Sequence, residues 1–114
     1  MQIADRICDE ILTEKYRDEE RIPSVREYSA EVEVNVNTVM RAYDYLQQQD
    51  VIFTKRGLGY YVAHGARTVI ETIRRKEFFD VALSDLVRSM DTLGISIDEV
   101  VEKLHVMKKT LSTK

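Results

Sequence analysis

The sequence predicts a mainly α-helical chain with one small β-hairpin. Three observations predict it: apolar residues at helical spacing in the first half, two short β-rich runs around a turn with two glycines, and apolar residues at heptad spacing in the last third. The 114 residues suffice for one modest core, but not for that core plus a full ligand-binding domain.

The first predicted helix covers residues 2–14. Apolar residues recur in it every four positions, at Ile3, Ile7 and Ile11. The single cysteine, Cys8, shares this apolar side and cannot form an intramolecular disulfide. We therefore expect Cys8 to be a small buried hydrophobe rather than a redox thiol.

N-capping residues predict the next two helices. Ser24 and Glu27 have the spacing of a capping box, so a short second helix begins after Ser24. Asn35 is a suitable N-cap for a third helix over residues 36–49, which ends near Asp50. Because so few residues separate these two helices, they must cross steeply.

Two β-rich runs, residues 51–54 and 60–62, predict a hairpin whose glycines supply the positive φ angles of its turn. Lys55 and Arg56 are expected at its tip. Helix, helix, tight turn, helix and hairpin is the order of elements in a winged helix-turn-helix. The fold class predicted is therefore a winged helix-turn-helix followed by a C-terminal two-helix dimerisation hairpin.

The charge is unevenly distributed along the chain. The formal net charge is -3, and acidic residues dominate residues 1–33. The predicted third helix and hairpin carry the cations Arg41, Lys55 and Arg56. Since affinity for DNA depends on the cations that reach phosphate, a net acidic chain is compatible with modest, salt-sensitive DNA binding.

The predicted third helix exposes Asn37, Thr38 and Arg41, which can hydrogen-bond base edges in the major groove. Such residues are also common on any solvated surface. A winged helix that binds proteins instead of DNA is the alternative function, and it would present apolar residues on this helix. Duplex DNA is the favoured partner.

Other classes of function are not indicated. No glycine-rich phosphate loop and no set of nucleophile, base and orienting residue is present, so we expect no enzyme and no cofactor. His64 and His105 lie far apart without a ligand set, so no metal site is expected. Neither a membrane segment nor a secretory signal is recognisable, which predicts a cytoplasmic protein.

Three motifs resemble one family of bacterial regulators. They are Ile22-Pro23-Ser24-Val25-Arg26-Glu27, Asn35-Val36-Asn37-Thr38-Val39-Met40-Arg41-Ala42-Tyr43 and Arg56-Gly57-Leu58-Gly59-Tyr60-Tyr61-Val62. Residues 3–62 resemble the N-terminal domain of GntR-family regulators, and the short helical C-terminus resembles the YtrA-like subfamily. The resemblance implies a homodimer that binds an inverted-repeat operator, usually as a repressor and often near genes for ABC-type transporters.

Carried over by position, the resemblance implies a set of DNA-binding residues. They are Ser24, Arg26, Asn35, Asn37, Thr38, Arg41, Lys55, Arg56 and Gly57. Val36 and Met40 depart from residues common in the family, so the operator sequence cannot be transferred. Glu14 and Asp50 stand where the family usually has glycine. The regulated genes, and whether a small-molecule effector exists, stay open.

The last third predicts two helices that meet at Gly94. Their heptad-spaced apolar residues exceed what one partner helix and a small winged domain can cover, so we expect a twofold dimer interface. Its candidate residues are Phe79, Leu83, Leu86, Met90, Leu104 and Leu111. Packing of these helices back on the first domain is the alternative. The predicted domains are 1–65 for DNA binding and 66–114 for dimerisation.

Overall fold

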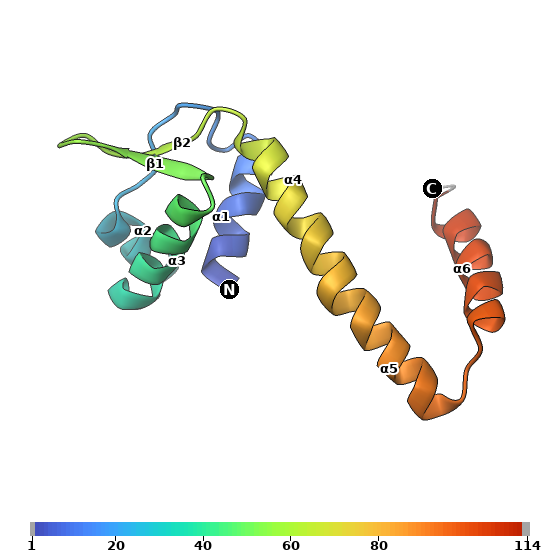
Figure 1. Ribbon diagram of the computed structural model, residues 1–114. Helices are drawn as coiled ribbons and strands as arrows, with labels where there is room; N and C mark the ends of the chain where they lie inside the picture. The colour runs from blue at the N-terminus through green and yellow to red at the C-terminus, as the bar shows by residue number, and fades with distance from the viewer. Residues whose placement is uncertain (1, 113–114) are drawn as a thin grey trace. The chain divides into compact units, whose positions relative to one another are not determined.

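The computed structural model describes residues 2–112, which form two compact units divided between Arg74 and Arg75. The helices and strands of the first unit are α1 (Gln2–Leu12), α2 (Val25–Val32), α3 (Val36–Gln48), β1 (Ile52–Lys55), β2 (Gly59–Val62) and most of α4 (Ala66–Glu77). α3 packs against α1, α2 and β1, and the hairpin extends away from the helices (Figure 1). The predicted winged helix-turn-helix is confirmed.

The predicted helix starts agree with the capping residues in the structure. Ser24 caps α2 with both hydrogen bonds of the capping box, and Asn35 caps α3. α1 and α3 end slightly earlier than predicted, at Leu12 and Gln48. Local hydrogen bonds to the last carbonyls turn the chain there, for example from the Asp50 N–H to the Gln47 oxygen at 3.1 Å.

Two residues at positions where the resemblance leads us to expect glycine adopt the left-handed backbone that glycine favours. Glu14 has a φ of 64° and Asp50 a φ of 63°. Each turns the chain after a helix, α1 and α3 respectively. A non-glycine residue costs about 1–2 kcal/mol in this conformation, so the local geometry is kept at the expense of some stability.

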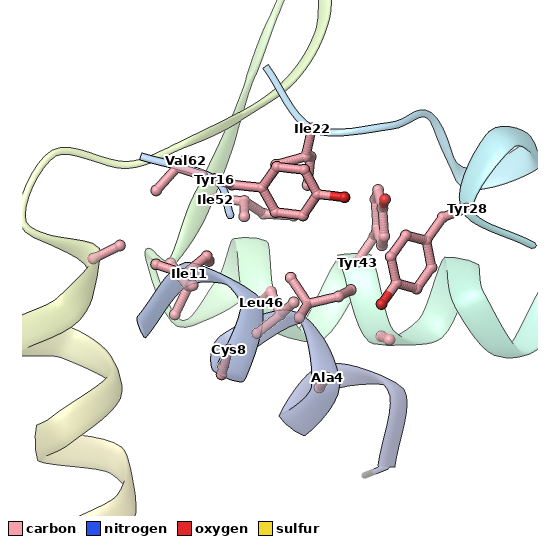
Figure 2. Close-up of a cluster of buried hydrophobic side chains, with 14 of the residues drawn as sticks. Ala4, Cys8, Ile11, Tyr16, Ile22, Tyr28, Tyr43, Leu46, Ile52 and Val62 are labelled. Carbon is pink, nitrogen blue, oxygen red and sulfur yellow. The ribbon is translucent and has the colours of Figure 1, made fainter. Parts of the chain in front are cut away.

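The core of the first unit lies between α1, α3 and the inner side of the hairpin (Figure 2). Cys8 is buried in it beside Ala4 and Ile11, as the sequence predicts. Ala66 and Ile70 are fully buried as well, so the beginning of α4 belongs to this core. The functional division into residues 1–65 and 66–114 stays a prediction.

Tyr43 of α3 joins three parts of this unit. Its side chain is fully buried, and its hydroxyl donates a hydrogen bond of 2.6 Å to the Pro23 carbonyl oxygen just before α2. Its ring meets the Tyr60 ring of β2 in a T-shaped contact with centroids 4.9 Å apart. Burial raises the pKa of the Tyr43 hydroxyl above its ordinary value, so the group remains a proton donor.

The second unit contains the end of α4, a π-helical turn (Phe78–Ala82), α5 (Leu83–Leu93) and α6 (Ile97–Ser112). Gly94 ends α5 with a φ of 68°, and the Ser96 hydroxyl accepts a hydrogen bond of 3.1 Å from the Glu99 N–H at the start of α6. Both predicted C-terminal helices are therefore confirmed. None of the described side chains from residue 75 onward is buried.

The hydroxyl of Tyr43 can be tested by substitution. We expect Tyr43→Phe to lower the free energy of unfolding by ~1 kcal/mol, because the Pro23 carbonyl loses its donor while the packing volume is kept. The measurement is urea unfolding at one fixed protein concentration. Tyr60→Phe is the control, since the structure records no hydrogen bond for that hydroxyl among the described residues. Equal effects of both substitutions would contradict the role assigned to Tyr43.

Candidate nucleic-acid interface

The first turn of α3 is fixed by Asn35. Its Oδ1 accepts a hydrogen bond of 2.7 Å from the Asn37 backbone N–H, which satisfies one of the donors left open at a helix start. Asn35 is exposed, but its side-chain oxygen Oδ1 already serves as the cap. Its amide nitrogen is the part of the side chain that can donate to DNA.

α3 has one fully buried side and one exposed side. Val39, Ala42, Tyr43 and Leu46 form the buried side, each with 0 % exposure. The predicted contact residues Asn37, Thr38 and Arg41 are all exposed. We call these three residues the α3 polar face. Because the opposite side is anchored in the core, the α3 polar face is held in one orientation.

Asp44 also lies on this side of α3, and the sequence analysis did not assign it a role. It follows Arg41 by three positions and is exposed. A carboxylate repels phosphate. Asp44 therefore disfavours a DNA backbone beside it and leaves the first turns of α3 as the part that DNA can approach closely. The spacing of four residues from Asn37 to Arg41 and three from Arg41 to Asp44 is the signal that could have placed Asp44 on this side of α3.

The start of α2 presents Ser24 and Arg26. The Ser24 N–H donates to the Glu27 carboxylate at 2.9 Å, and the Glu27 N–H donates to the Ser24 Oγ at 3.1 Å. Hydrogen bonding to Ser24, first to its backbone N–H and then to its side chain, holds the pKa of the Glu27 carboxyl below its ordinary value. Ser24 is thus primarily a capping residue. Arg26 is exposed in the first turn of α2.

The hairpin carries its cations at the tip, as predicted. Lys55 ends β1, and its Nζ lies 4.5 Å from the centroid of the Tyr61 ring, a cation-π contact that orients the ammonium group. Arg56 and Gly57 follow in the turn and are exposed, and Gly57 has a φ of 73°. The turn is closed by a hydrogen bond of 2.9 Å from the Leu58 N–H to the Lys55 oxygen.

The structure brings all nine predicted DNA-binding residues onto the exposed or half-exposed surface of one unit. They form three groups, at the start of α2, on α3 and at the hairpin tip. Tyr43 connects the elements that carry them, through Pro23 before α2 and through Tyr60 on β2. The three groups are therefore parts of one packed framework.

This fold, with a polar α3 surface and a hairpin tipped by cations, defines the chain as a winged helix-turn-helix DNA-binding transcription regulator. Residues 1–62 match the family described as "Bacterial regulatory proteins, gntR family". The chain belongs to the GntR family.

Two relatives whose names describe transcription regulators support this family assignment. The HTH-type transcriptional regulator YhcF of Bacillus subtilis (strain 168) is 30% identical over 90% of this chain and 83% of its own length. The HTH-type transcriptional repressor YtrA of the same organism is 31% identical over 82% of this chain and 68% of its own. The predicted resemblance to YtrA-like regulators is confirmed.

A solved structure is similar over almost the whole length. The crystal structure of a GntR-family transcriptional regulator from Bacteroides thetaiotaomicron has 49% sequence identity and a TM-score of 0.84, and the match covers 97% of each chain. The family and these relatives are transcription regulators rather than enzymes. Within residues 2–112, no helix has the length and apolar character that crossing a membrane requires.

The capping role of Asn35 is testable. We expect Asn35→Ala to lower the free energy of unfolding by ~1 kcal/mol, because the first turn of α3 loses its cap. Asn35→Asp keeps an accepting oxygen and should preserve stability. Asn37→Ala, which removes an exposed side chain in the first turn of the same helix, is the control and should change stability by less than about 0.5 kcal/mol. Thermal unfolding at fixed protein concentration provides the comparison.

Proposed function

We propose that this GntR-family protein is a repressor that binds an inverted-repeat operator as a homodimer. The observation that carries the proposal is the α3 polar face, in which three exposed hydrogen-bonding side chains stand opposite a completely buried side. Amide, hydroxyl and guanidinium groups are the side chains that read base edges in the major groove. The name of the relative YtrA supports repression in particular.

In this proposal the three groups of exposed residues have different tasks. The α3 polar face enters the major groove and reads bases, with Arg41 as the side chain best suited to bidentate pairing with guanine. Ser24 and Arg26 meet the phosphate backbone from α2, and the hairpin, acting as a wing, brings Lys55 and Arg56 to the flanking backbone or minor groove. Gly57 lets the turn approach DNA closely because it carries no side chain.

Dimerisation is supported by the apolar surface of the second unit. Five of the six predicted interface residues are more than one-third exposed in the single chain: Phe79 51%, Leu83 40%, Leu86 38%, Leu104 54% and Leu111 60%. The sixth residue, Met90, is intermediate in exposure. Exposed apolar surface of this extent is unusual for a monomer and typical of an interaction surface.

One exposed helix face adds to this support. It is formed by Phe79, Leu83, Ser84, Val87 and Arg88 and is open to solvent. A second copy can cover this face and remove its apolar side chains from water. A twofold dimer would present two α3 helices to two half-sites of an inverted repeat, about 34 Å apart along the duplex.

We also propose that the protein acts in the cytoplasm, because bacterial DNA is found there.

The DNA-binding role is tested with operators obtained from the protein itself. Genome-wide recovery of bound DNA should yield an inverted repeat, and the purified protein should bind a duplex with that repeat. We expect Arg41→Ala to weaken binding to this duplex by ~1–3 kcal/mol while binding to unrelated DNA changes little. Electrophoretic mobility shifts at fixed salt concentration provide the measurement.

Arg6→Ala is the matched control, since Arg6 is an exposed arginine on α1 and is not one of the nine predicted contact residues. It should bind like the unmodified protein. A uniform loss of affinity for all DNA would reassign Arg41 to phosphate contact. Unchanged binding would remove Arg41 from the interface, and failure of the unmodified protein to bind any recovered duplex would favour a winged helix that binds proteins.

The dimer is tested by placing a charge in the predicted seam. We expect Leu86→Glu to convert a dimer to a monomer at micromolar concentration, because a carboxylate buried in an apolar interface has no partner. Sedimentation equilibrium measures the mass. Thr92→Glu adds the same charge to α5 outside the heptad positions, and this variant should remain a dimer. A monomeric unmodified protein would contradict the proposed assembly.

A further inference from the structure

The chain that precedes α2 pairs with the wing through an isolated β-bridge. Arg21 is paired antiparallel to Tyr61 of β2, and three backbone hydrogen bonds of 2.8–3.0 Å join residues 19–22 to β2. Ile22, at the end of this segment, is only 2% exposed. The segment is therefore fixed in the core at one end and held against the hairpin by its backbone.

The Arg21 side chain extends from this segment to the turn of the wing. Its Nε donates a hydrogen bond of 3.1 Å to the Leu58 carbonyl oxygen, which lies in the exposed turn. The Tyr61 hydroxyl donates to the same oxygen at 3.4 Å. Arg21 is separated from Leu58 by 37 positions in sequence, so this contact ties the turn to a distant part of the chain.

The guanidinium group fits against Gly59. A Cβ atom at position 59 would lie 3.1 Å from the Arg21 Nε, closer than most real Cβ contacts, and 3.5 Å from its Nη2. The φ of Gly59 is +103°, which also favours glycine. The absence of a side chain at Gly59 thus allows the Arg21 side chain to pass alongside the backbone of the turn.

This contact matters because the turn is otherwise exposed. Lys55, Arg56, Gly57 and Leu58 are all exposed, and an isolated two-stranded hairpin is marginally stable in water. A turn that is already held in place loses less conformational entropy when it binds. Through Arg21 the turn is connected to Ile22 in the core.

We propose that Arg21 is a positioning residue that holds the tip of the wing in its DNA-binding arrangement, through the hydrogen bond from its Nε rather than through contact with phosphate. The consequence for DNA binding rests on the proposed function, in which the wing contacts DNA. The hydrogen bond itself is a property of the free protein and can be measured without DNA.

Three substitutions separate the hydrogen bond from the charge. Arg21→Gln places an amide nitrogen at the position of the arginine Nε and removes the charge. Arg21→Lys keeps the charge and has a methylene at that position. Arg21→Ala removes both. Arg17→Ala, at an exposed arginine in the same loop between α1 and α2, is the matched control.

We expect the backbone amides of residues 57–60 to exchange hydrogen faster in the free Ala and Lys variants than in the unmodified protein, the Gln variant and the Arg17→Ala control. Affinity for the recovered operator should fall about threefold to tenfold in the Ala and Lys variants, as expected for the loss of one hydrogen bond. The Gln variant should bind nearly as well as the unmodified protein. The dependence of affinity on salt should be the same in all of them, because no phosphate contact is lost.

Two results would overturn the proposal. The first is equal hydrogen exchange at the tip in all variants, which would show that Arg21 does not hold it. The second is full affinity for the operator in the Lys variant and reduced affinity in the Ala and Gln variants. If the slope of affinity against salt is also shallower by about one in the Ala and Gln variants, Arg21 behaves as a phosphate ligand. Failure of the unmodified protein to bind DNA would instead contradict the proposed function, while the exchange data would still decide whether Arg21 holds the tip.

Discussion

The structure of the DNA-binding unit depends on the burial of Tyr43. This side chain is fully buried in α3, donates to the Pro23 carbonyl oxygen and packs against the Tyr60 ring. A large aromatic side chain supplies much apolar contact, and its hydroxyl must find an acceptor when it is removed from water. One residue therefore sets the position of the α2 start, of α3 and of the hairpin relative to one another.

This arrangement means that the surface proposed to contact DNA is already formed in the free protein. The α3 polar face is oriented by the four buried residues opposite it, α2 begins at a fully formed capping box, and Lys55 rests on the Tyr61 ring. Binding to a preformed surface requires little ordering of the protein, so more of the interaction energy is available for discrimination between sequences. A preformed surface is useful here because a protein with a net negative charge has only weak non-specific electrostatic attraction to DNA.

Features that depend on neighbours in sequence could be predicted. Ser24 and Asn35 cap the helices that the sequence assigned to them, and the glycines of the hairpin have positive φ angles. The role of Arg21 could not be predicted, because its contact with Leu58 exists only after residues 19–22 pair with β2. The exposed apolar residues of α5 follow the predicted heptad spacing, but a single chain does not identify what covers them.

The pairing of residues 19–22 with β2 also affects how the protein behaves at high concentration. This segment covers one edge of the hairpin and satisfies backbone groups of β2 that would otherwise be open to pairing with another molecule. The other edge of the hairpin is β1, which has four residues and ends in Lys55. Short, charged edges resist strand-to-strand aggregation, so this wing can extend from the helices into solvent without becoming a template for aggregates.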